Sequence, residues 1–259
     1  MPNSLRPKFR HAAFAIWARN MLVLRKMLGP SIVVNFGEPL LYLVGLGFGL
    51  GVYIGGQMDM PYLTFLASGI LASSAMNTAT FEALFGVFTR MVPQKSYDAM
   101  LASPLEIADI LAGETLYCAT KSVIHGVGIL LVALLLGAVT SWQALWVLPI
   151  LFLVGLTFAS LALIMTAYAS SYAGFSYYTT LVMMPLMLVS GVFYPITALP
   201  EVMQGIISGL PLIHAVQLVR PLMAGLPVTD VVLHLAVLTA YGAVGYLVAV
   251  RLVQKRLCV

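Results

Sequence analysis

Long apolar segments, each about as long as a membrane-spanning helix, fill most of this chain. A helix needs about 20 mostly apolar residues to cross the hydrocarbon core of a bilayer. Six segments meet this requirement: 31–54, 61–86, 115–138, 143–167, 175–193 and 229–250. The sequence therefore predicts an all-α integral membrane protein with six transmembrane helices.

Composition argues against a water-soluble fold. Charged residues make up only 8% of the chain and apolar residues 61%, whereas a soluble domain is about one quarter charged. A soluble protein of 259 residues with so few charges would expose large apolar patches to water. Lipid is the solvent that suits this composition.

The first 30 residues are predicted to form a helix that lies in the membrane interface. Apolar side chains such as Phe9 and Trp17 occur near one face of residues 5–28, and basic side chains occupy much of the rest. A helix with two such faces lies at the lipid headgroups and does not cross the bilayer. We therefore divide the chain into an amphipathic interface helix, 1–30, and a transmembrane domain, 31–259.

The segment 194–227 differs from the other connections because it is apolar yet contains five prolines. Its two short apolar pieces, about 200–209 and 212–224, are each too short to cross a membrane. They predict two short re-entrant helices at the outer face, directly before the last span.

The distribution of basic residues predicts that both termini are cytoplasmic. Cytoplasmic segments of membrane proteins carry an excess of Lys and Arg. With this orientation the outside holds only Arg220, and Lys121 lies within a span. The inside segments hold Arg6, Lys8, Arg10, Arg19, Arg25, Lys26, Arg90, Lys95, Arg251, Lys255 and Arg256. Because these residues flank apolar segments, we expect them to anchor the chain at a membrane and not to bind nucleic acid.

Charged residues inside spans are costly and are functional candidates by default. The candidates are Glu38, Glu82, Glu114, at the start of the third predicted span, and Lys121. All four are predicted to lie in the inner half of the membrane. In one interpretation Lys121 pairs with a carboxylate as a structural tie; in the other, these side chains form a ring that contacts a polar headgroup. His125, one turn beyond Lys121, is either a packing residue or part of a proton relay.

Motifs for catalysis and for nucleotide or metal binding are absent from the sequence. It contains no GxSxG, no HExxH and no GxxxxGK[ST]. We therefore expect no catalytic residue, no metal site and no cofactor on this chain. If ATP powers the protein, a separate polypeptide supplies the ATPase.

Four glycines in the first predicted span, at 45, 47, 49 and 51, form two interleaved GxxxG pairs. Such pairs let helices approach closely. Contact within the chain and contact between two protomers both remain open.

The segment 187–225 resembles the signature region of ABC-2 type permeases. The similarity lies in the stretch Ser190–Pro195, in Leu199-Pro200, and in the residues from Leu210 to Val216. Within that family the chain looks most like the nodulation-type permeases that export lipo-oligosaccharides. The matching outer residues are Ser190, Gly191, Tyr194, Pro195, Pro200, Pro211, His214 and Arg220.

The resemblance implies a permease subunit in a bacterial inner membrane. Two such chains would pair as a homodimer, and two separate subunits carrying ATP and Mg would dock below them. The polar loop 89–114 would then hold a coupling helix at about 94–103. The coupling residues would be Gln94, Lys95, Ser96, Tyr97, Asp98 and Leu101.

The expected function is export of an amphiphile, a glycolipid or lipo-oligosaccharide, with Glu38, Glu82, Lys121 and His125 as candidates for the substrate path. Two alternatives remain. One is a hydrophobic drug exporter of the same family, and the other is a secondary transporter driven by protons through Glu38, Lys121 and His125. A membrane enzyme is disfavoured because the sequence shows no nucleophile–base pattern.

Overall fold

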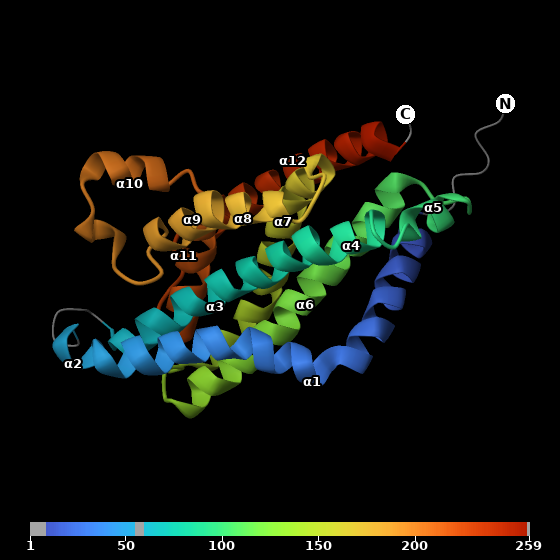
Figure 1. The fold of residues 1–259 in the computed structure, drawn as a ribbon. Coiled ribbons are helices and arrows are strands. Elements are labelled where there is room, and N and C mark those ends of the chain that lie inside the picture. The colour runs from blue at the N-terminus through green and yellow to red at the C-terminus, as the bar shows by residue number, and fades with distance from the viewer. Residues whose placement is uncertain (1–8, 55–59, 258–259) are drawn as a thin grey trace.

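The computed structural model describes residues 9–54 and 60–257, and every regular element within these ranges is a helix (Figure 1). The predicted all-α class is therefore confirmed. The first half contains α1 Phe9–Gly49, α2 Gly51–Ile54, α3 Tyr62–Phe81, η1 Glu82–Val87, α4 Phe88–Met91, α5 Ser96–Leu101 and α6 Ile107–Leu135. The second half contains η2 Trp142–Trp146, α7 Val147–Tyr168, α8 Ala173–Tyr178, η3 Thr179–Met183, α9 Met184–Val189, η4 Ile196–Ala198, α10 Glu201–Ile207, α11 Pro211–Ala224 and α12 Val231–Leu257.

Three segments in the described part of the chain are long and apolar enough to cross a membrane by themselves: α6, the unit 142–168 and α12. Shorter apolar helices cover Pro39–Tyr53 and Ala173–Val189, and α10 and α11 form a bent pair at 94°. The fifth predicted span, 175–193, is thus shorter than expected. It ends at a turn in which Gly191 has a φ of 74°, a value that glycine adopts without strain.

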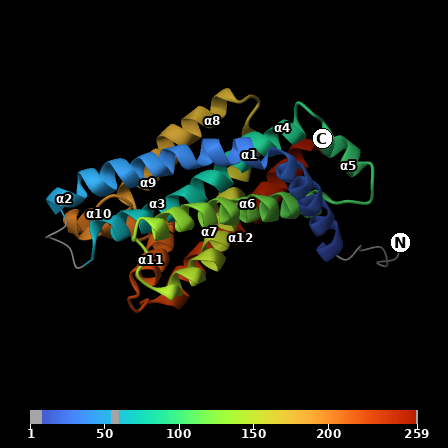
Figure 2. The same ribbon diagram turned by 90° about the horizontal axis from the view of Figure 1, so that it is seen from below.

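The helix α1 corrects the prediction of two separate N-terminal helices. It is continuous across Gly29 and Pro30, where the sequence predicted an end. A proline inside a helix removes one hydrogen bond and bends the axis. Figures 1 and 2 show the first turns of α1 at a marked angle to the rest of the helix. The third predicted span is also longer than expected, because α6 begins at Ile107.

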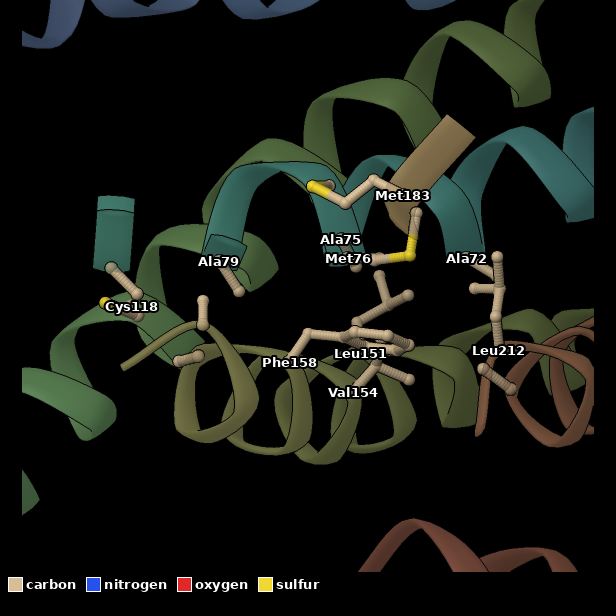
Figure 3. Close-up of a cluster of buried hydrophobic side chains, with 14 of the residues drawn as sticks. Ala72, Ala75, Met76, Ala79, Cys118, Leu151, Val154, Phe158, Met183 and Leu212 are labelled. Atoms are coloured by element: carbon tan, nitrogen blue, oxygen red, sulfur yellow. The ribbon is translucent and has the colours of Figure 1, made fainter. Parts of the chain in front are cut away.

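The helix α3 lies at the centre of the molecule and packs against α1, α6, α7 and α11. Small residues make this possible because they allow helix backbones to approach closely. Figure 3 shows Ala72, Ala75 and Ala79 of α3 on the side that faces α7, where Leu151 and Phe158 fill the space. The rod formed by α3, η1 and α4 is therefore the axis around which the other helices pack.

The short helices α2, α5 and α10 lie at two opposite ends of the molecule (Figures 1 and 2). Figures 1 and 2 both place α5 and the C-terminal part of α12 at one end, and α2 and α10 at the other. We call these the α5 end and the α10 end.

The four glycines of the first predicted span divide into two pairs. A Cβ on Gly47 would collide with Leu63 of α3, and one on Gly51 would touch Tyr62. Gly45 and Gly49 face nothing in the described part of the chain within 4 Å. One GxxxG pair therefore serves contact within the chain, and the other is exposed.

The contact between α6 and α7 depends on Gly155. A Cβ there would lie 2.7 Å from the Cα atom of Ala119, which is backbone and cannot move aside cheaply. We expect Gly155→Ala to lower the free energy of unfolding by about 1–3 kcal/mol, measured by thermal unfolding in detergent. Gly205→Ala in α10, where a Cβ meets open space, is the matched control and should be neutral or stabilising. Equal effects of the two substitutions would contradict the close packing.

Candidate functional site

The site begins where α3 widens into a short π-helix. This segment, η1, runs from Glu82 to Val87 and continues directly into α4. Single π-helical turns within α-helices occur frequently at functional sites. A Cβ on Gly86 would collide with the Glu82 carboxylate, so the glycine leaves the space in which that carboxylate lies.

Arg90 of α4 joins two carboxylates from different helices, the buried Glu114 and the partly buried Glu82. Its Nη2 atom lies 3.1 Å from Oε1 of Glu82 and 2.7 Å from Oε2 of Glu114, and its Nε donates to Oε1 of Glu114 at 3.0 Å. Lys121 of α6 donates from Nζ to Oε2 of Glu82 at 2.7 Å. Arg90 thus holds Glu114 in the bidentate geometry that is the strongest form of this pair.

The part of α1 before Gly29, which we call its first arm, completes the arrangement. Asn20 donates from Nδ2 to Oε2 of Glu114 at 2.8 Å, and the Arg19 guanidinium lies 3.5 Å from Oε1 of the same carboxylate. Arg19 also contacts the Sδ atom of Met100 in α5 at 3.3 Å. We call Arg19, Asn20, Glu82, Arg90, Glu114 and Lys121 the charge cluster.

Burial makes the charge cluster energetically important. The Glu114 side chain is fully buried, and those of Glu82 and Arg90 are 10% and 18% exposed. Desolvating charges costs several kcal/mol per ion, which is offset only when the remaining hydrogen-bonding positions are also filled. Here every carboxylate oxygen has a partner, so the cluster is a satisfied network of three cations and two anions that ties together α1, α4, η1 and α6.

The predicted substrate-path residues are placed differently from one another. Glu82 and Lys121 bind each other within the charge cluster. His125 is buried nearby, with Nδ1 3.2 Å from the Thr78 hydroxyl oxygen. Glu38 lies in α1, but its side chain is outside the part of the chain that the structure describes. The geometry therefore brings Glu82 and Lys121 together as an ion pair.

The roles of Arg90, Arg19 and Asn20 were not predicted from the sequence. Arg90 was expected in the polar loop and Arg19 at the lipid surface, but both side chains contact Glu114. Glu114 itself is in the second turn of α6 and does not open the helix, because the helix begins at Ile107. The available signal was the position of Arg90 just two turns after Glu82, which a continuous helix places on one side.

The predicted coupling segment contains a single short helix, α5, at the α5 end. Lys95, with a φ of 48°, forms the turn that precedes it. Gln94, Lys95 and Asp98 are exposed, and Ser96 and Leu101 are partly buried. Tyr97 is fully buried, and its hydroxyl has no hydrogen-bond partner among the described residues. Burial raises the pKa of Tyr97 well above its usual range, so the hydroxyl stays protonated.

A second partly buried cation, Arg220, lies toward the α10 end. Arg220 of α11 donates from Nη2 to the Gly191 carbonyl oxygen at 2.6 Å and from Nε to the Ser68 hydroxyl at 3.2 Å. Its guanidinium also lies 3.6 Å from the centre of the Phe65 ring, a favourable cation–π arrangement. Arg220 thus ties the turn after α9 to α3 and α11.

The other residues of the predicted outer signature surround this tie. Ser190 is buried and bonds the Leu186 carbonyl oxygen, and Tyr194 and Pro195 are partly buried. Pro200 precedes α10 and Pro211 opens α11. His214 is buried against α12, with Nδ1 2.8 Å from Nδ1 of His234. The signature residues therefore shape the turn and the helix starts of one region.

Together these features define a polytopic helical membrane protein whose buried charges are satisfied internally. Residues 11–224 match the family model described as ABC-2 type transporter. The chain belongs to this family and is a transport permease, as the signature in 187–225 indicated.

Relatives along nearly the whole chain agree with this assignment. The chain is 44% identical to nodulation protein J of Rhizobium leguminosarum bv. viciae, over 94% of each chain. It is 41% identical to nodulation protein J of Rhizobium meliloti, over 94% of this chain and 93% of the relative. The inner membrane transport permease YadH of Escherichia coli is 25% identical, over 93% of this chain and 94% of the relative.

The buried Glu114 carboxylate should be essential for stability. We expect Glu114→Gln to lower the free energy of unfolding by about 3–5 kcal/mol, because Arg90 loses its bidentate partner and stays buried. Thermal unfolding in detergent measures this loss. Glu201→Gln, at an exposed position of α10, is the control and should change little. If both variants unfold alike, the charge cluster does not stabilise the fold.

Tyr97 should behave in the opposite way. Because its buried hydroxyl has no partner among the described residues, Tyr97→Phe should leave the unfolding free energy unchanged or raise it. The matched control is Tyr246→Phe, which removes a hydrogen bond of 2.6 Å to the Ala108 carbonyl oxygen and should cost about 1 kcal/mol. A larger loss for Tyr97→Phe than for Tyr246→Phe would show that the Tyr97 hydroxyl is bonded in the folded state.

Proposed function

We propose that this chain is the membrane subunit of an ATP-driven exporter that moves a glycolipid or lipo-oligosaccharide outward across a bacterial inner membrane. The nodulation protein J relatives support the choice of an amphiphilic, saccharide-bearing substrate. The observation that carries the proposal is the charge cluster. Through Arg19, which contacts Met100, it connects α5 to α1, to the rod formed by α3, η1 and α4, and to α6.

ATP hydrolysis is assigned to a separate subunit that docks at the α5 end. The exposed side chains of Gln94, Lys95 and Asp98 offer it a polar contact surface. A displacement of α5 would move its own Tyr97, which is fully buried, and its own Met100, which contacts Arg19. Arg19 in turn touches Glu114, so the charge cluster would carry the movement into α3 and α6.

In the proposed membrane arrangement the chain crosses the bilayer six times. The crossings are the part of α1 after Pro30, the rod 62–91, α6, α7, the unit 173–189 and α12. The pair α10 and α11 is then re-entrant, because a bend of 94° turns the second helix away from the first. The α5 end is assigned to the cytoplasm, since the last turn of α12 carries Lys255 and Arg256 and basic residues favour that side.

A homodimer is supported by surfaces left uncovered in a single chain. Gly45 and Gly49 are exposed on α1 together with Leu41, Val44 and Phe48. Small residues on an apolar helix favour close contact with another helix in a membrane. A second copy of the chain would cover this face.

Gentle purification of the chain from native membranes tests the proposal directly. An ATP-binding subunit should copurify in stoichiometric amount and show vanadate-sensitive ATP hydrolysis. If the chain purifies alone and moves solute in proton-loaded vesicles without ATP, the ATP-driven proposal is wrong and a secondary transporter takes its place.

A charge reversal on α5 locates the docking surface. We expect Asp98→Lys to reduce copurification of the ATPase and ATP-dependent export by about tenfold, because reversing a charge disrupts electrostatic complementarity across an interface, without loss of melting temperature. Glu201→Lys is the matched control, since Glu201 is an exposed acidic residue of a short helix at the α10 end. Equal export by both variants would exclude α5 from the interface.

A further inference from the structure

A groove opens between α1, α3 and the unit formed by η3 and α9. Its larger part has a volume of about 320 Å³, and an adjoining part of about 270 Å³ shares Tyr42, Asn77, Phe81 and Met187 with it. Among the described residues that line either part, none carries a charge. Uncharged polar groups line it instead: Ser73, Ser74, Asn77, Thr78, Thr179 and Thr180.

Asn77 is the unusual member of this lining. From 64 to 80, every residue of α3 is buried except Asn77, which is partly exposed to the groove. Its carboxamide has no hydrogen-bond partner among the described residues, whereas neighbouring Thr78 contacts His125. It lies halfway along the rod 62–91, about 22 Å from either end at 1.5 Å per residue.

That position has an energetic consequence. A carboxamide offers two donors and two acceptor sites, and leaving such a group without partners in an apolar medium costs several kcal/mol. In the middle of a membrane, a partner with both donors and acceptors therefore gains most by binding here. Hydroxyl groups have both.

We infer that this groove binds the neutral, hydroxyl-rich saccharide part of the exported amphiphile, with Asn77 as its central hydrogen-bonding residue. This inference rests on the proposed export function and assigns its substrate contacts to Asn77 of α3, a residue that was not among the candidates predicted from the sequence. Tyr42 and Phe81 supply flat apolar walls, as aromatic residues do in small-molecule sites. Met183, Met184 and Met187 form a flexible wall that adapts to irregular shapes.

The groove should reject charged headgroups. No described lining residue offers an opposite charge, and an unpaired ion in a low-dielectric site is far costlier than a neutral hydroxyl. The acidic and basic side chains closest along the rod, Glu82 and Arg90, are already paired within the charge cluster. The lining that the structure describes therefore selects for neutral polar groups.

Binding to the purified full-length chain in lipid nanodiscs tests this assignment without an ATPase. The probes are a fluorescent N-acyl chitotriose, and a fatty acid and a fatty alcohol with the same labelled chain. The wild-type chain should bind the chitotriose probe most tightly. Asn77→Leu should weaken that binding by about tenfold, the effect of one lost hydrogen bond to a buried polar group, and leave alcohol binding unchanged.

Thr80→Val is the matched control, because Thr80 lies one turn along the same helix with a buried hydroxyl that has no partner among the described residues. It should bind all three probes as the wild type does. Thr180→Val provides a second test if Asn77→Leu fails to fold, and should weaken chitotriose binding several-fold. Equal binding of the chitotriose and fatty acid probes, or full binding by Asn77→Leu or Thr180→Val, would overturn the inference. Selective binding without a copurifying ATPase would instead contradict only the export proposal.

Discussion

The ion pair between Arg90 and Glu114 is the interaction on which the α5 end of the molecule depends. Glu114 is fully buried on α6, and a carboxylate there is tolerable only because Arg90 meets it with two hydrogen bonds. Arg90 reaches it because α3, η1 and α4 form one rod that carries the guanidinium back toward α6. Removing either partner leaves an uncompensated charge, so the position of the rod relative to α6 is fixed by electrostatics as well as by packing.

The same rod contributes residues to three sites along its length. Toward the α10 end, its Ser68 and Phe65 contact Arg220, which in turn binds the carbonyl oxygen of Gly191 and holds the turn there. Halfway along, Asn77 lines the neutral groove. One turn beyond, Glu82 begins the charge cluster. Because interiors are close-packed and transmit displacement, a movement passed from α5 to the charge cluster would reach the groove and the turn at Gly191 along this rod.

Two sequence signals, the length of the apolar segments and the similarity to a family motif, predicted part of the structure. They indicated an all-helical membrane fold, the family and the start of the short helices after Pro200 and Pro211. The bend in α1 was mistaken for a helix end because the sequence changes there from a basic, amphipathic stretch to an apolar one. Arg90 was expected to face water and Arg19 to face lipid headgroups. Neither ion pair was foreseen, because their common partner, Glu114, is 24 residues or more away along the chain. Ion pairs between helices are a property of packing, which periodicity does not encode.

The distribution of charge along the rod bears on how a membrane protein moves a polar substrate. Both charged levels are satisfied internally, Arg220 by carbonyl and ring contacts and Glu82 by two cations. The level between them presents the Asn77 carboxamide, which is neutral, to the groove. A saccharide hydroxyl exchanges water for Asn77 at little net cost, whereas an ion would have to leave water without compensation. The fold therefore uses charge to hold its helices together and neutral polarity to receive what it transports.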